Sequence, residues 1–402
     1  MWIRSSILFR YQLIVLVLVV FFQLPLYANM RFQIPIPQEE QQLIDTLPTE
    51  VQGCDAAARE AIFKQAYQEA LDYLACAINK DTGNVSYYLS RAFVKSRLLD
   101  YEGAIRDYDL ILTKKLTWSE AYESYFNRAL AKAASNDLRS ALTDFDNAIY
   151  LNPGYAEAFY NRSIVKWKCG DYIGELSDLN KVIKLKPEDS NAFNSRGIAQ
   201  SMMGDYTGAM ADFNKAIELK SDNVWALFNR ALLFERLDDN IHALRDYTAA
   251  LSFKSDVEIY NRRAMVKEKM KDYRGAVDDY NAAEALDSTY AKTFFNRARL
   301  KCVLMDYPAA VEDYSQCIRY QSDYARAYYE RALAREKAGE KSGVIEDYSY
   351  AIEFGSGDGE SYNRRGLARL NTGDSEGGCS DLKKAEELGS DAGYQNYQKY
   401  CK

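Results

Sequence analysis

An arginine and an aspartate recur together down this 402-residue chain at one fixed separation, from Arg91 and Asp107 to Arg365 and Asp381. The residues around each pair read as a helix, a tight break and a second helix. In the unit of Arg297 and Asp313, Asp306 suits a helix cap. Pro308 suits the first turn of the next helix, where a missing N–H costs nothing. If the break lies near Met305, the arginine and the aspartate are level across an antiparallel helix pair.

The same pair is present nine times. The arginines are Arg91, Arg128, Arg162, Arg196, Arg230, Arg263, Arg297, Arg331 and Arg365, and the aspartates are Asp107, Asp144, Asp178, Asp212, Asp246, Asp279, Asp313, Asp347 and Asp381. Only the step from Arg91 to Arg128 is clearly longer than the others. Nine copies in one register, with a period of about 34 residues, predict helix–turn–helix units stacked into a solenoid. Because a solenoid grows in one dimension, a chain of this length needs no single large core.

A small residue follows the arginine in every unit, as the close approach of two helices requires. These residues are Ala92, Ala129, Ser163, Gly197, Ala231, Ala264, Ala298, Ala332 and Gly366. Together with the aromatic positions and the period, they resemble the tetratricopeptide repeat (TPR) superfamily over residues 54–402. The chain looks most like exported bacterial TPR proteins whose repeats read Asn-Arg-Ala or Asn-Arg-Gly in the first helix and Asp-Tyr or Asp-Phe in the second. One departure is the arginine, which stands where leucine is commoner.

The resemblance implies an all-α fold, a TPR solenoid in which helix-turn-helix repeats form a right-handed superhelix. In that family the first helix of each repeat, helix A, lines a concave groove. Family members serve mainly as protein-interaction scaffolds, and the superfamily does not specify the ligand.

The repeats set the expected organisation of the chain. Residues 1–28 read as a signal peptide, 29–53 as a flexible linker, 54–85 as a degenerate N-terminal capping repeat, 86–390 as nine TPR repeats and 391–402 as a C-terminal capping helix. Capping elements are expected because a terminal repeat would otherwise expose its apolar face.

The N-terminus has the order of a secretory signal. Arg4 and Arg10 are followed by an unbroken apolar run over residues 13–22. Pro25 ends the run, and a cleavage point follows Ala28. The run is short for a membrane span. A cleaved signal and an uncleaved N-terminal anchor remain open, and the anchor would be the only contact with a membrane. Both place the rest of the chain outside the cytoplasm, in the periplasm or at the cell envelope.

The amino-acid composition limits the partners and the catalytic activities that can be expected of this protein. A net charge of −7 argues against nucleic acid as the main partner. The single histidine, His242, disfavours histidine-based triads, metal sites and acid–base catalysis. The sequence has no phosphate-binding loop, nucleophile elbow or metal-ligand cluster. We therefore expect no enzyme activity, no cofactor and no metal.

Two interpretations of the Arg–Asp ladder remain open: a basic track for an acidic partner, or an ion pair between the two helices of each repeat. Level placement and one-to-one stoichiometry favour the ion pair. The predicted structural ion pairs are Arg162–Asp178, Arg196–Asp212, Arg230–Asp246, Arg297–Asp313 and Arg331–Asp347. A second basic residue follows the arginine by four positions in seven units. It lies on the same helix face, where it shares the aspartate, extends to solvent or contacts a ligand.

The residues two positions before each arginine face the groove in TPR domains, as the resemblance implies. They are Leu89, Phe126, Tyr160, Asn194, Phe228, Asn261, Phe295, Tyr329 and Asn363. Aromatic and amide side chains suit contact with a peptide or a sugar. We predict a partner-binding groove formed by Phe126, Tyr160, Trp167, Phe228, Phe295 and Tyr329. The alternative is packing between neighbouring A helices.

One second helix departs from the pattern. Glu175 occupies a position that is alanine in six other units, where the side chain is expected to be small and buried. We expect a local distortion of that repeat, with a functional notch as the alternative.

Four of the seven cysteines form two pairs with equal spacing. Cys54 and Cys76 are separated by the same length of chain as Cys379 and Cys401. Each pair brackets a helical hairpin of a terminal unit and lies level across it. Because an exported chain permits disulfides, we predict that a disulfide bond closes the hairpin at each end of the solenoid.

The leading hypothesis is a non-enzymatic, exported scaffold that binds a protein or peptide in the groove, where a rigid superhelix preorganises the aromatic side chains. The alternative is a receptor for an envelope polysaccharide or a peptidoglycan fragment that uses the same aromatics. Chaperone C-terminal tails are disfavoured, because mostly apolar residues stand near the positions where a carboxylate clamp needs Lys and Asn. The sequence identifies neither the partner nor the oligomeric state.

Overall fold

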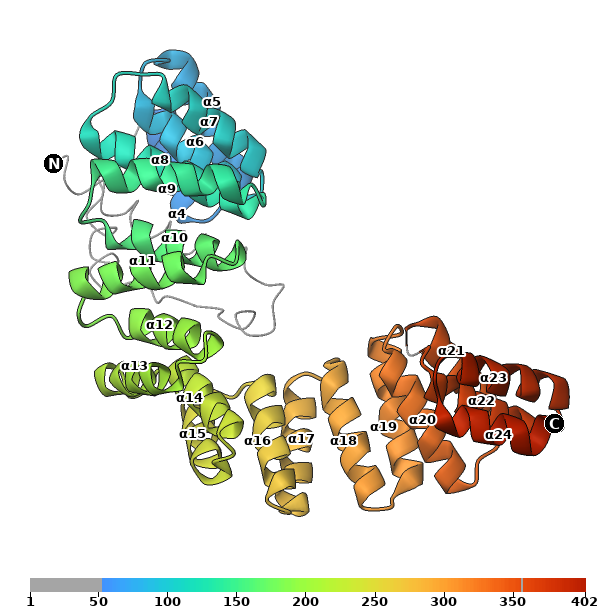
Figure 1. The fold of residues 1–402 in the computed structure, drawn as a ribbon. Helices are drawn as coiled ribbons and strands as arrows, with labels where there is room; N and C mark the ends of the chain where they lie inside the picture. The colour runs from blue at the N-terminus through green and yellow to red at the C-terminus, as the bar shows by residue number, and fades with distance from the viewer. Residues whose placement is uncertain (1–52, 356) are drawn as a thin grey trace. The chain divides into compact units, whose positions relative to one another are not determined.

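The computed structural model describes residues 53–402 except Ser356. The predicted signal peptide and the linker up to residue 52 therefore lie outside the described residues. Over those described, the chain forms 21 helices and no strand, so the fold is all-α as predicted (Figure 1).

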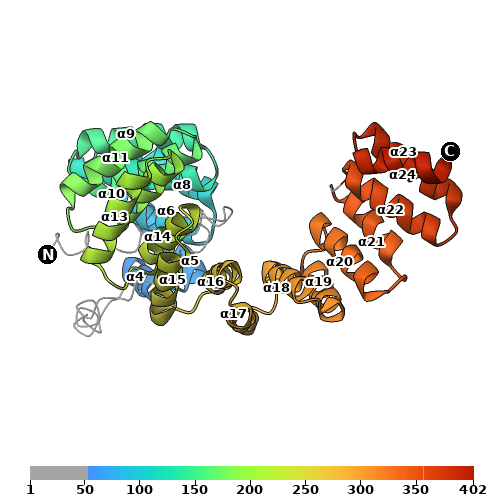
Figure 2. The ribbon, with the colours of Figure 1, turned by 60° about the horizontal axis from the view of Figure 1, so that its bottom comes forward.

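The first compact unit ends at Asp212, and its described residues begin at Gly53. Its helices are α4 (Cys54–Phe63), α5 (Tyr67–Lys80), α6 (Val85–Arg97), α7 (Tyr101–Leu112), α8 (Trp118–Ala134), α9 (Leu138–Leu151), α10 (Ala156–Lys168), α11 (Tyr172–Leu185), α12 (Ser190–Met202) and the first half of α13 (Tyr206–Leu219). In each pair from α4–α5 to α22–α23 the even-numbered helix is the A helix and the odd-numbered helix is the B helix. Figure 2 shows the labelled helices from a second side. The longer step in the repeat falls between α7 and α8.

The second compact unit comprises Phe213–Lys402. Beyond the end of α13, its helices are α14 (Val224–Arg236), α15 (Asn240–Phe253), α16 (Val257–Lys269), α17 (Tyr273–Leu286), α18 (Ala291–Val303), α19 (Tyr307–Tyr320), α20 (Ala325–Ala338), α21 (Val344–Glu353), α22 (Gly359–Asn371), α23 (Ser375–Glu387) and α24 (Asp391–Cys401). Within each unit, a helix makes its main contacts with helices one or two places away in the chain.

Most B helices begin at an aspartate cap, whereas α5 and α21 begin after Ala66 and Gly343 without a side-chain cap. In α19 the Asp306 side chain accepts a hydrogen bond from the Ala309 backbone N–H, and Pro308 lies in the first turn, both as predicted. The turn before the cap passes through Met305, whose φ is 62°. Further caps of this kind are Asp100, Asp137, Asp171, Asp239, Asp272 and Asp374. The aspartate side chain accepts hydrogen bonds from N–H groups that the first turn leaves unpaired. Its negative charge also interacts favourably with the positive end of the helix dipole.

Small and aromatic residues share the core of each pair. Ala298 on α18 and Ala310 on α19 are fully buried, and this lets the two helices approach closely. The aromatic residue after the buried aspartate fills the space beside them, as Tyr247, Tyr280, Tyr314 and Tyr348 do in the second unit.

The expected distortion at Glu175 is absent. α11 is an unbroken helix of 14 residues, the same length as α9. Glu175 is 2% exposed, and its Oε2 atom has no hydrogen-bond partner among the described residues. Burial, with a smaller contribution from Asp171, raises the pKa of Glu175 to about 8. The helix stays regular because a protonated carboxyl group carries no charge into the interior.

Candidate functional site

The structure brings every Arg–Asp pair of the ladder together. Arg297 donates from Nε to Asp313 Oδ2 at 2.9 Å and from Nη2 to Oδ1 at 2.8 Å. The same two-pronged contact forms at Arg162–Asp178, Arg196–Asp212, Arg230–Asp246 and Arg331–Asp347. The carboxylates are buried between helices A and B of one repeat. This position fits a structural ion pair better than a track for an acidic partner.

The second basic column shares these carboxylates. Lys301 Nζ lies 2.8 Å from Asp313 Oδ2, and Arg335 Nη1 lies 2.6 Å from Asp347 Oδ2. Asp212 and Asp246 have only their arginine within ion-pair distance among the described residues, because Gln200 and Phe234 stand at the second basic position. In two of the nine repeats the ladder aspartate is therefore paired with one cation only.

Sequence reasoning missed a third contact of the arginine. Nη1 of Arg297 donates to Asn281 Oδ1 at 2.7 Å, on helix B of the preceding repeat. The equivalent acceptors for other arginines are Asp109, Asp146, Asn180, Asn214, Thr248, Ser315 and Ser349. Each of these polar residues lies two positions after a ladder aspartate, and this was the available signal. The arginine thus ties its own repeat to the one before it.

Burial alone would lower the pKa of Arg297, but its hydrogen bonds and charge interactions with Asp313 and Glu284 raise that pKa above its usual value. Arg297 is therefore charged at physiological pH. A buried, fully hydrogen-bonded pair of this kind fixes helix register more than it adds net stability.

Three of the six predicted groove residues lie in the core, which corrects that prediction. Phe126, Phe228 and Phe295 are 2%, 4% and 6% exposed. The Phe295 ring meets Tyr314 of its own repeat edge-on at 5.7 Å and stacks on Tyr324 at 5.0 Å. These side chains point toward helix B and the following repeat, so they pack the interface and do not face a partner.

The other three predicted groove residues are half-buried. Tyr160 Oη lies 3.0 Å from Ser195 Oγ of the next A helix, and burial raises the pKa of Tyr160 to about 12. Trp167 donates from Nε1 to Met202 Sδ at 3.4 Å. Tyr329 meets the Tyr348 ring edge-on at 5.7 Å. Tyr160 and Trp167 share the A-helix face of the first unit, where Met202 is 43% exposed.

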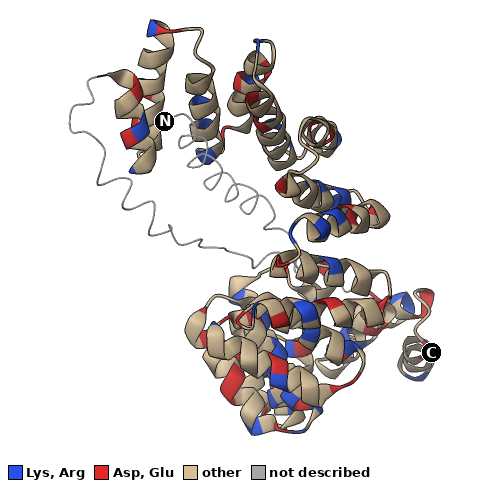
Figure 3. Ribbon diagram, turned by 90° about the vertical axis from the view of Figure 1, so that its left-hand side faces the viewer, with Lys and Arg blue, Asp and Glu red and all other residues tan. Residues whose placement is uncertain are grey.

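Carboxylates occupy the A-helix face of the second unit, and sequence reasoning missed them. Glu235, Glu268 and Glu336 each follow a ladder arginine by five positions. Tyr247 donates its hydroxyl to Glu235, and Tyr280 donates to Glu268. In the first unit the same position holds Ser96, Ala133, Trp167 and Ser201. The A-helix faces of the two units therefore differ in charge, although basic and acidic residues are mixed over the ribbon in the view of Figure 3.

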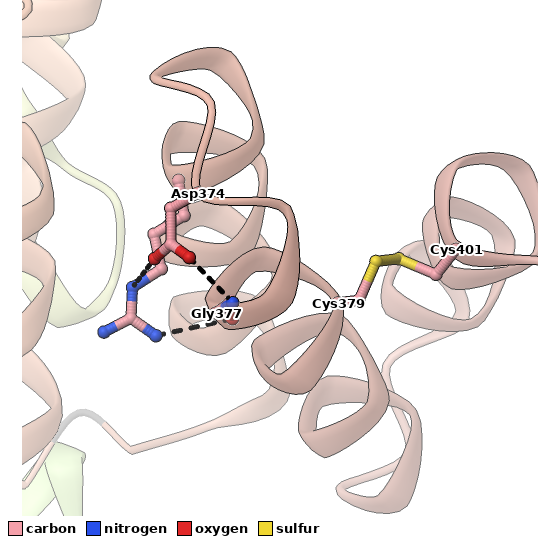
Figure 4. Close-up of a disulfide and its surroundings, with 5 residues drawn as sticks. Asp374, Gly377, Cys379 and Cys401 are labelled. Carbon is pink, nitrogen blue, oxygen red and sulfur yellow. Dashed lines mark hydrogen bonds and ion pairs between the residues drawn. A yellow bond between two sulfur atoms is a disulfide. The ribbon is translucent and has the colours of Figure 1, made fainter.

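The structure brings both predicted cysteine pairs within disulfide distance. The Cα atoms are 5.8 Å apart for Cys54 and Cys76, and 5.6 Å apart for Cys379 and Cys401. The second pair joins α23 to α24 beside the cap in which Asp374 accepts from the Gly377 N–H (Figure 4). Cys169, Cys302 and Cys317 are free, and Cys302 does not pair with Cys317.

The described residues contain neither a candidate metal site nor a candidate membrane-spanning helix. No group of three or more His, Cys, Asp or Glu side chains there could hold a metal ion. Nor is any helix that the structure describes long and apolar enough to cross a membrane.

Two repeat-family models match the sequence. A model described as TPR repeat matches residues 202–238, and one described as tetratricopeptide repeat matches residues 257–290. No curated protein matches the chain.

Several solved TPR structures have a similar fold. A TPR protein from Parabacteroides merdae is 19% identical, covering 61% of this chain and 99% of its own, with a TM-score of 0.45. YrrB, described as a TPR protein with an unusual peptide-binding site, is 19% identical over 46% of this chain and 97% of its own, with a TM-score of 0.39. Yeast Tom70 is 11% identical over 87% of this chain and 88% of its own, with a TM-score of 0.45. At these values the likenesses carry no inference about what this chain binds.

The matched models fall on two units of a helix pair that recurs in one register along the chain. The chain is a tetratricopeptide repeat protein.

Proposed function

We propose that this TPR chain is a non-enzymatic scaffold that binds a protein or peptide on the A-helix face of its first unit. One observation carries the proposal: Tyr160 and Trp167 lie on one face of α10, half-buried and beside the 43% exposed Met202. A face of aromatic and thioether groups offers apolar area with few polar groups to desolvate. Because packing and hydrogen bonds already hold these side chains in place, an extended ligand binds them with a smaller loss of conformational entropy.

The proposal includes export to the cell envelope. It is supported by the signal-like order of residues 1–28 and by the two cysteine pairs of the end hairpins, since disulfides persist outside the cytoplasm. Cell fractionation followed by N-terminal sequencing of the mature protein is the test. We expect the protein in the envelope fraction with Asn29 at its N-terminus, and a cytoplasmic protein would contradict export.

Binding is tested with the full chain immobilised against an envelope extract and, in parallel, against soluble peptidoglycan fragments. We expect a bound polypeptide, and we expect its amount to fall when Tyr160→Ala and Trp167→Ala are combined. Trp118→Ala is the matched control, because that indole is 71% exposed at the first residue of α8. Capture of glycan fragments alone would replace the scaffold function with that of a polysaccharide receptor.

A further inference from the structure

The sequence between the expected cleavage point and the first repeat begins with an apolar segment. Over residues 30–37, the apolar side chains of Met30, Phe32, Ile34 and Ile36 alternate with polar residues and prolines. Residues 38–42, which follow, are glutamine and glutamate only. We call residues 30–37 the N-terminal segment. Its apolar side chains are not what a solvated linker requires, so they call for a surface that covers them.

The sequence of the N-terminal segment favours an extended backbone. Alternate side chains of an extended chain lie on opposite sides, so the pattern predicts the four apolar residues on one side. Pro35 and Pro37 fix their own φ angles, and they disfavour the helical region for Ile34 and Ile36 before them. The segment therefore loses little conformational entropy when it binds as an extended chain.

The A-helix face of the first unit has the matching chemistry. Trp167 donates its indole N–H to Met202 Sδ at 3.4 Å, and the Tyr160 hydroxyl is paired with Ser195 Oγ at 3.0 Å. These polar groups are already engaged within the protein. A ligand therefore meets mainly the ring and thioether surfaces of half-buried Tyr160 and Trp167 and of Met202, which is 43% exposed. Such surfaces favour aliphatic, aromatic and proline side chains.

The N-terminal segment is tethered within reach of this face. At about 3.3 Å per extended residue, the chain from Ile36 to Gly53 spans up to about 55 Å. Gly53 directly precedes α4, and α10 is the third A helix after α4 in the same unit. With about 10 Å between neighbouring packed helices, α10 lies about 30 Å from α4. A tether of this length gives an effective concentration on the order of millimolar, so even a weak contact is populated.

We propose that the N-terminal segment binds the A-helix face of the first unit and competes there with the polypeptide partner. Phe32, Ile34 and Ile36 cover the rings of Tyr160 and Trp167, and the partner binds by displacing them. The same chemistry specifies the partner as an extended, apolar, proline-containing polypeptide. This assignment rests on the proposed scaffold function.

The test uses the full mature chain, from Asn29, and a labelled synthetic peptide of residues 30–37. The key variant combines Phe32→Ser, Ile34→Ser and Ile36→Ser, and it leaves the sequence of every repeat unchanged. We expect the peptide to bind this variant about tenfold more tightly than wild type, because in wild type the tethered segment already occupies the face. A peptide that carries the same three serines should bind neither chain.

The receiving face is tested in the key variant. Adding Tyr160→Ala and Trp167→Ala should remove peptide binding while the circular dichroism spectrum is unchanged, and adding Trp118→Ala should leave peptide binding intact. Peptide binding that survives the loss of Tyr160 and Trp167 overturns this assignment. Equal binding of the peptide to wild type and to the key variant overturns it as well.

Capture from the envelope extract separates this assignment from the scaffold function. We expect the key variant to capture several times more polypeptide than wild type, because its face is uncovered. If the key variant binds no peptide but both chains capture a polypeptide, this assignment is overturned and the scaffold function stands. If neither chain binds the peptide or captures a polypeptide, both are overturned.

Discussion

Each ladder aspartate is a buried carboxylate whose cost of burial is offset by the cations that touch it. Asp347 is contacted by both Arg331 and Arg335, whereas Asp246 is contacted by Arg230 alone among the described residues. The free energy that one ladder arginine contributes therefore differs from repeat to repeat.

This asymmetry gives a direct prediction. Arg230→Leu leaves Asp246 uncompensated and should cost about 3 kcal/mol, whereas Arg331→Leu should cost about half as much because Arg335 remains. Arg230→Ala should be worse than Arg230→Leu, because it also leaves a cavity. Denaturant unfolding of the three variants measures these losses. Equal losses for the two leucine variants would show that the second cation does not share the charge.

Glu175 makes stability depend on pH. Its pKa is about 8 in the folded chain, against an ordinary value of 4.5. The folded state therefore holds this proton more tightly than the unfolded state, so its contribution is complete below pH 4.5 and is lost as the pH rises to 8. Glu175→Gln should be more stable than wild type by about 4 kcal/mol at pH 8, with no gain at pH 4.

Thermal melts of wild type and Glu175→Gln across that pH range provide the measurement. Glu346→Gln is the control for the loss of one carboxylate, because Glu346 is exposed on α21. Parallel profiles for wild type and Glu175→Gln would mean that Glu175 finds a partner or water that compensates its charge.

At the scale of the element, the terminal hairpins differ from the inner ones. Among the described helices, α4–α5 and α23–α24 each have a neighbour on one side only, and these hairpins carry the two cysteine pairs. The arginine of an inner hairpin contacts the preceding repeat, and the arginine of the following repeat contacts the inner hairpin in turn. Inner hairpins are therefore held from both sides. A covalent link compensates for the missing neighbour by restricting the unfolded hairpin.

We predict that Cys54–Cys76 and Cys379–Cys401 are oxidised in the exported protein. Peptide mapping without reductant should recover both links. Reduction, or Cys379→Ala, should lower stability by up to about 3 kcal/mol for a loop of this length. Cys169→Ala is the control, because that thiol is exposed and free. Alkylation of all four cysteines without prior reduction would contradict the prediction that these two disulfides form.

At the scale of the whole molecule, stability is a sum over neighbouring repeats. Because each helix contacts mainly helices one or two places away, a local loss cannot spread through a common core. We predict that Arg331→Leu raises amide hydrogen exchange in α18 to α23 and leaves α6 to α9 unchanged. Exchange mass spectrometry of the variant and wild type resolves these segments. A uniform rise along the chain would indicate one cooperative unit.

The sequence by itself determined the helices, the register and the partners within each repeat. Because every helical residue advances the chain by the same rise, two residues equally far from a tight turn come level across it. Arg297 and Asp313 were therefore predictable by counting from Met305. The cap at Asp306 and the cysteine pairs followed from similarly local arithmetic.

Only the tertiary structure decided what happens between repeats. The direction of the Phe295 ring, the reach of Arg297 to Asn281 and the contact of Arg299 with Glu268 depend on how one helix pair is offset against the next. Side-chain direction and that offset are not set by spacing along one helix. For this reason the sequence predicted the repeat correctly but placed three buried phenylalanines on its binding face.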